Sequence, residues 1–72
     1  MFYAIVIEKG ESSYGAYVPD LPGCVAVGES EEEVRSLIHE AIDLHLESLR
    51  EEGLILPHPQ AIVEYVEIKT AA

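Results

Sequence analysis

Apolar residues fall into five stretches of this chain, and their spacing differs from one stretch to the next. Residues 1–9, 14–18, 24–28 and 61–69 are short and rich in β-branched and aromatic side chains, which is typical of strands. Residues 31–52 carry apolar side chains three and four positions apart, which is the spacing of an amphipathic helix. The pattern therefore predicts three strands, one long helix and a final strand.

The helix has both a start signal and a stop signal. Ser30 and Glu33 form the S-x-x-E pattern of a capping box, in which each side chain bonds a backbone N–H near the other residue. Gly53 suits the left-handed position just after a helix. Leu37 and Leu44 widen the apolar stripe beyond one contact surface, and the rest of the stripe is Val34, Ile38, Ala41, Ile42, Leu46 and Leu49.

This order of elements predicts an α+β fold of the form β-β-β-α-β in one domain, residues 1–72. The first three strands would form an antiparallel meander, with a tight turn at residues 10–13 joining the first two. A strand that follows a helical crossover usually lies parallel to its neighbour with right-handed chirality. We therefore expect sheet order 3-2-1-4, with the last strand parallel to the first and the helix on one face. A compact chain of this length has a radius of gyration of about 11 Å.

The first strand is apolar on both sides, which is typical of a strand that is covered on each face. One side carries Phe2, Ala4 and Val6, and the other carries Tyr3, Ile5 and Ile7. Because the chain has only one helix, the second face needs a cover from another copy or another protein. So small a domain also buries little of its surface alone. We therefore expect a homo-oligomer.

Two loops contain paired prolines. In the first, Pro19 and Pro22 restrict the backbone around Asp20, whose side chain can bond its own main chain. In the second, Pro57 and Pro59 keep the chain extended between the helix and the last strand and exclude helix there. Both loops are predicted to have a defined shape.

The charge of the chain restricts its partners. The net charge is −10 and only four residues are basic, so there is no lysine or arginine patch for direct nucleic-acid binding. A protein partner would be basic. The single cysteine, Cys24, excludes an internal disulfide and fits a reducing cytosol, and no apolar run is long enough to span a membrane. We expect a cytoplasmic protein.

Four motifs follow one another along the chain: YAIVIEK, YGAYVPDLPGC, VGESEEEV and EGLILPHP. Together they resemble the HicB-type antitoxin family of bacterial and archaeal toxin–antitoxin systems. The resemblance implies a partial RNase H-like fold, and it implies binding and neutralisation of a small, basic, mRNA-cleaving toxin of the HicA type. Many such antitoxins also carry a C-terminal DNA-binding domain. The chain ends at Ala72 without one, so we expect a short form that makes no direct DNA contact.

An RNase H-like fold raises the question of metal-dependent cleavage, which needs several converging carboxylates. The available acids are Glu8, Glu40, Asp43, Glu64 and Glu67, but Ile5 and Val6 occupy the middle of the first strand, where the active enzymes have aspartates. His39 and His45 are six residues apart and cannot share a metal as an i, i+4 pair could. The prediction is therefore no catalysis, no metal and no cofactor.

The candidate partner-binding residues lie in the first loop and at the start of the helix: Asp20, Leu21, Pro22, Glu29, Glu32 and Glu33. Acids at a helix N-terminus also favour the helix itself, so the acidic run has a structural explanation as well. Two alternatives to the antitoxin hypothesis stay open: a self-assembling adaptor module without a toxin, and a degenerate nuclease.

Overall fold

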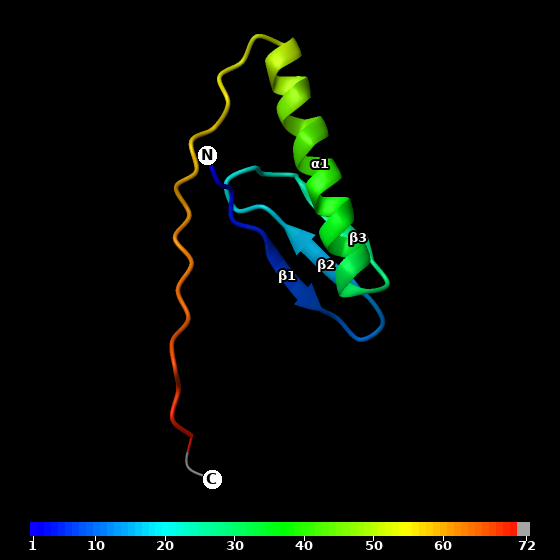
Figure 1. Ribbon diagram of the computed structural model, residues 1–72, viewed down its shortest axis with the longest axis vertical. Coiled ribbons are helices and arrows are strands. Elements are labelled where there is room, and N and C mark those ends of the chain that lie inside the picture. The colour runs from blue at the N-terminus through cyan, green and yellow to red at the C-terminus, as the bar shows by residue number, and fades with distance from the viewer. Residues whose placement is uncertain (71–72) are drawn as a thin grey trace.

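The computed structural model describes residues 1–70, and its sheet has three antiparallel strands. They are β1 (Val6–Lys9), β2 (Tyr14–Tyr17) and β3 (Val25–Gly28), in the order β1-β2-β3 (Figure 1). The Gly10 N–H donates to the Ser13 carbonyl at 2.7 Å and closes the turn between β1 and β2. The predicted meander is confirmed, although each strand is shorter than the apolar stretch that predicted it.

The helix α1 (Glu31–Glu51) crosses one face of this sheet (Figure 1). Its last carbonyls accept bonds from the Gly53 N–H, at 3.0 Å, and the Leu54 N–H, at 2.9 Å. With Gly53 at a positive φ of 74°, this is the Schellman ending that the glycine predicted. Within residues 1–70, no helix combines the length and the apolar character that crossing a membrane requires.

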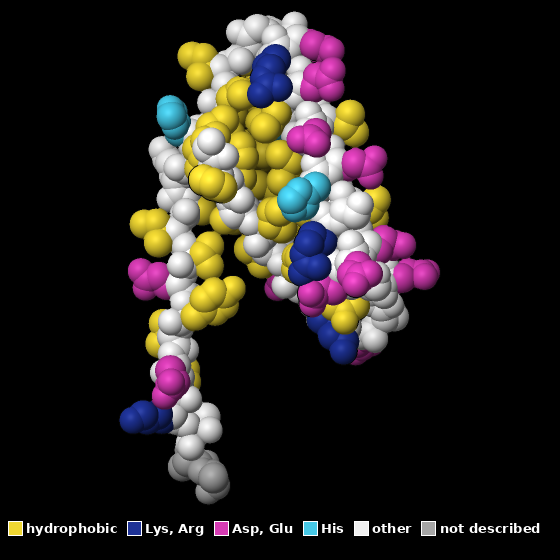
Figure 2. All heavy atoms as spheres, in the orientation of Figure 1, with side chains coloured by type: hydrophobic (Ala, Val, Ile, Leu, Met, Phe, Trp, Pro, Cys, Tyr) yellow, Lys and Arg dark blue, Asp and Glu magenta, His cyan; other side chains and the backbone are white. Residues whose placement is uncertain are grey.

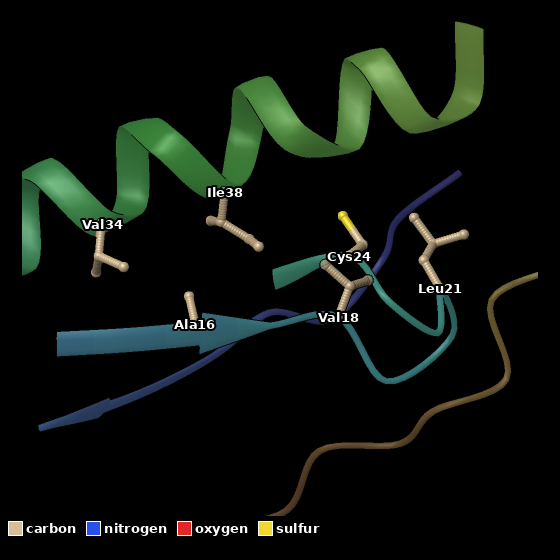
Figure 3. Close-up of a cluster of buried hydrophobic side chains, with 6 residues drawn as sticks. All are labelled: Ala16, Val18, Leu21, Cys24, Val34 and Ile38. Carbon is tan, nitrogen blue, oxygen red and sulfur yellow. The ribbon is translucent and has the colours of Figure 1, made fainter. Parts of the chain in front are cut away.

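The core lies between α1 and the sheet (Figure 3). Cross-strand pairing puts Ile7, Ala16 and Ala26 in one row, and this row faces the helix. The small side chains in that row let α1 come close to the sheet. Six residues make up the buried cluster: Ala16, Val18, Leu21, Cys24, Val34 and Ile38.

Gly28 is where the helix comes closest to the strands. A Cβ atom at this position would lie 2.9 Å from the Val34 backbone nitrogen, so any side chain larger than hydrogen would push β3 and α1 apart. The sharp return from β3 into the helix therefore depends on a glycine here.

The other face of the sheet has no cover within residues 1–70. Because side chains alternate along a strand, the row formed by Val6, Tyr17 and Val25 points away from the helix. Tyr17 and Val25 are exposed, as is Val27 two residues further on. The prediction that one helix covers one face only is confirmed.

The predicted fourth strand was wrong for the isolated chain. Residues 61–69 are not hydrogen-bonded to the sheet, whose strand order ends at β1, and they run away from it as an extended trace (Figure 1). The longest dimension is 55 Å and the radius of gyration is 14.8 Å, against the roughly 11 Å expected for a compact chain. The partial RNase H-like arrangement stays a prediction.

Candidate partner-binding surface

The first turn of α1 is fixed by its own acidic and hydroxyl side chains. Ser30 is the N-cap, and its Oγ accepts a bond from the Glu33 N–H at 3.1 Å. Glu33 Oε1 accepts from the Glu29 N–H at 2.8 Å, one residue before the cap residue itself. The predicted capping box is therefore present with its return bond shifted by one residue.

The four acids around this turn differ in their surroundings. Glu33 is used by the cap, and Glu31 forms an exposed ion pair with Arg35 at 2.7 Å. An exposed i, i+4 pair of this kind is worth only about 0.3–0.5 kcal/mol. Glu29 and Glu32 are exposed and carry charge that this network does not use. Figure 2 shows acidic side chains gathered along the α1 side of the molecule.

The loop after β2 is a compact turn rather than an open docking segment. The Leu21 N–H donates to the Val18 carbonyl at 3.0 Å, and the Cys24 N–H donates to the Leu21 carbonyl at 3.0 Å. Gly23 has a φ of 85°, which suits a glycine. The Leu21 side chain is fully buried beside Cys24 and Val18 (Figure 3). Leu21 therefore belongs to the core, whereas Pro22 is exposed.

Asp20 holds the C-terminal part of the chain. Its two carboxylate oxygens accept bonds from the Gln60 N–H at 3.1 Å and the Ala61 N–H at 3.2 Å. Nearby, the Tyr3 hydroxyl donates to the Pro57 carbonyl. These bonds join residues 40 or more positions apart, so no local pattern predicts them. The prolines at 57 and 59, which predict a shaped loop, are the only sequence signal that points towards them.

The candidate residues form two separate groups. The loop with Asp20 and Pro22 lies at one end of the strands, and the turn that leads into α1, with Glu29 and Glu32, lies at the other end (Figure 1). The length of β3 separates them. A partner that contacts only one end of the sheet can meet one group but not both.

The reactive side chains do not assemble a chemical site. Burial raises the pKa of the Cys24 thiol, which keeps it protonated and a poor nucleophile. Within the part of the chain that the structure describes, no three His, Cys, Asp or Glu side chains come close enough to hold a metal ion. No pocket is present among the same residues.

Comparison with known families gives this surface a context. The family described as "HicB_like antitoxin of bacterial toxin-antitoxin system" matches residues 3–70. This chain belongs to the HicB-like antitoxin family. The resemblance seen in its four motifs is thereby confirmed.

Relatives of this HicB-like chain occur in distant organisms. It is 42% identical to a UPF0150 protein of Helicobacter pylori, over 99% of this chain and 100% of that protein. It is 41% identical to a UPF0150 protein of Archaeoglobus fulgidus, over 97% of this chain and 99% of that protein. It is also 38% identical to an "Uncharacterized 14.9 kDa protein in rep-hol intergenic region" of Haemophilus phage HP1, over 92% of this chain. The chain spans 50% of the length of that phage protein.

Among solved structures, the HicB-like chain resembles a chain of the HicA3 and HicB3 toxin-antitoxin complex. The TM-score is 0.69 at 34% sequence identity, over 85% of this chain and 72% of the other. The sequence comparison and the structural comparison therefore both support the antitoxin family, and the structural comparison also supports the α+β architecture.

Proposed function

We propose that this chain binds a small, basic, mRNA-cleaving toxin of the HicA type and neutralises it by covering its RNA-binding surface. The likeness to a chain of the HicA3 and HicB3 complex carries this proposal. The chain acts by binding alone, in the cytoplasm where the toxin meets mRNA, and it needs no metal or cofactor. It makes no direct contact with nucleic acid.

Charge supports this choice of partner. The chain carries a net charge of −10, and an RNA-binding surface must be basic to hold phosphates. Complementary charge speeds the encounter of two proteins more than it sets their affinity. The association rate is therefore the quantity that depends most strongly on salt.

Of the candidate residues, Glu29 and Glu32 are best suited to meet the toxin. Both are exposed, and their charges are not taken up by the cap or by the ion pair with Arg35. Pro22, at the other end of the sheet, is a secondary contact. Asp20 instead holds Gln60 and Ala61, and Glu33 holds the helix start, so their contribution is to position neighbouring backbone.

The chain also associates with itself. Large apolar side chains are exposed on the open face of the sheet and along residues 62–68, and an exposed apolar surface of this kind marks an interface. Self-association and toxin binding use different parts of the molecule, because the acidic helix start and the apolar residues do not overlap.

Association kinetics test the toxin-binding part directly. The analyte is a small basic toxin of the HicA type, and the variant is Glu29→Gln with Glu32→Gln. We expect the association rate at low salt to fall about 3- to 10-fold and the salt dependence to become shallower. The matched control, Glu51→Gln with Glu52→Gln, removes the same charge at the other end of α1.

An equal fall in the association rate of both double variants would show that only net charge matters. It would contradict the proposal that Glu29 and Glu32 contact the toxin. Absence of binding by the parent chain would contradict the proposed function as a whole.

A further inference from the structure

The C-terminal residues have the composition of a strand and no strand partner within residues 1–70. They alternate Ile62, Val66 and Ile68 on one side with Val63 and Tyr65 on the other. All five are exposed, Ile62 at 84% and Val66 at 74%. Figure 2 shows these apolar side chains standing out from the extended segment. We call residues 61–69 the tail.

The direction in which the tail leaves the folded part is fixed. Asp20 holds the backbone at Gln60 and Ala61, and Tyr3 holds it at Pro57. Beyond these contacts the tail passes β1 and diverges from it (Figure 1). As a result the tail is presented outward, and the β1 edge of the same chain is left without a neighbour.

β1 is the strand of the sheet that α1 covers least. Among residues 1–70, β1 pairs only with β2, so one row of its backbone groups is open, and such an edge is a template for another strand. On the helix side, Ile5 and Ile7 are only half-buried, because α1 packs mainly over β3 and β2. On the other side β1 contributes the half-buried Val6 to the row that continues through the exposed Tyr17 of β2 and Val25 of β3. A strand added here needs apolar residues on both sides, and the tail has them.

We propose that two copies of this chain exchange tails, so that residues 61–69 of each copy form a fourth strand on the β1 edge of the other. This specifies the self-association proposed above and does not depend on the toxin. Each copy has one donor strand, the tail, and one β1 edge, so two copies satisfy both in a closed two-fold arrangement.

Charge favours a second copy over a basic partner as the occupant of the β1 edge. The tail carries Glu64, Glu67 and Lys69, and β1 carries Glu8 and Lys9, so both surfaces are close to neutral in a chain of net charge −10. A basic protein would gain little at either surface, whereas two copies can meet there without bringing their acidic helix starts together.

The area involved is sufficient for a stable dimer. Burying one large apolar side chain removes roughly 60–120 Å² from water. Five such side chains on each of two tails, with the surfaces they cover, give on the order of 1,200–2,400 Å², and stable interfaces bury about 1,200–2,000 Å².

The oligomeric state of variants is the first test, measured by sedimentation equilibrium on the full chain without toxin. Val66→Asp puts a charge into the exchanged strand, and we expect the dimer dissociation constant to rise about 100-fold or more. The control, Leu44→Asp, charges a similarly exposed aliphatic residue on α1, 66% exposed, and should stay within about 3-fold of the parent. A monomeric parent, or equal weakening by both variants, would overturn the proposal.

A second test needs no substitution and separates exchange from other dimers. Isotopically labelled and unlabelled chains are mixed, unfolded together and refolded, and contacts between labelled and unlabelled copies are selected by NMR. We expect contacts from the tail methyl groups of one copy to β1 of the other. Tail–β1 contacts found only within one copy, or a dimer whose tails contact no β1 strand, would overturn the exchange. Toxin binding is measured separately, so failure of either idea leaves the other testable.

Discussion

The folded part of this molecule, residues 1–53, and the tail use nearly the same kinds of residues with opposite outcomes. In β1 the alternating apolar residues pair with β2 and pack beneath α1. In the tail, residues of the same kind pair with nothing within the described chain and stay exposed. An alternating pattern therefore specifies the ability to form a strand, and the presence of an open edge within reach decides whether the strand forms.

The largest contrast between the two regions is expected from one isoleucine in each. Ile38 is fully buried and Ile62 is 84% exposed. Ile38→Ala should lower the free energy of unfolding by about 2–5 kcal/mol, because it leaves a cavity between α1 and the sheet. Ile62→Ala should change it by less than about 0.5 kcal/mol at concentrations where the chain is monomeric. Urea unfolding followed by circular dichroism measures both free energies, and a similar loss at the two sites would contradict the difference in burial between Ile38 and Ile62.

Two glycines of the folded part differ in the space around them, and substituting each one tests how closely α1 approaches β3. A Cβ at Gly28 meets the Val34 backbone at 2.9 Å, whereas a Cβ at Gly15 meets no atom within 4 Å. Gly28→Ala should destabilise the fold by about 1–3 kcal/mol through overpacking. Gly15→Ala, in β2, should be neutral or stabilise by up to about 1 kcal/mol. Thermal unfolding measures the pair, and a neutral Gly28→Ala would show that α1 does not approach β3 so closely.

The helix cap gives a smaller effect, again confined to the folded part. Ser30→Ala removes the acceptor of the Glu33 N–H and should lower the free energy of unfolding by about 1 kcal/mol. Ser30→Asp keeps an acceptor and should retain most of the stability. Chemical denaturation of the two variants makes the test, and equal loss in both would contradict the capping role of the hydroxyl.

The smallest effect is expected where the two regions meet. Asp20→Ala removes both acceptors of the Gln60 and Ala61 N–H groups. Amide exchange at these two positions should speed up about 10-fold, which corresponds to about 1.4 kcal/mol, while the unfolding midpoint stays nearly unchanged. Asp20→Asn retains an amide oxygen and should give an intermediate rate. Unchanged exchange in Asp20→Ala would show that other contacts direct the tail.

Much of the folded part could be predicted because its signals are local. Ser30 and Gly53 mark the helix ends by their own chemistry, and the apolar spacing of α1 selects the face that Val34 and Ile38 bury. The separation of residues 61–69 from the sheet could not be predicted, because pairing depends on where residues 54–60 direct the chain. That direction comes from the bonds of Asp20 and Tyr3 to distant backbone, which leave no mark on spacing or composition.

Among the candidate partner-binding residues, too, the sequence predicts the exposure of some and not the burial of others. Glu29 and Glu32 are exposed as their place around a helix start predicts. The sequence predicts that Leu21 contacts a partner together with its loop neighbours Asp20 and Pro22, yet Leu21 is fully buried in the core. A leucine between Asp20 and Pro22 gives no sign of this, because burial depends on the turn that Gly23 closes.

Neutralisation of a HicA-type toxin is the activity proposed for this chain, and a titration of ribonuclease activity measures it directly. A small basic toxin of the HicA type is incubated with an mRNA substrate and increasing amounts of the chain. We predict that cleavage falls linearly and ends at a fixed stoichiometric ratio, while an unrelated ribonuclease is unaffected. Undiminished cleavage in the presence of excess folded chain would contradict the antitoxin account.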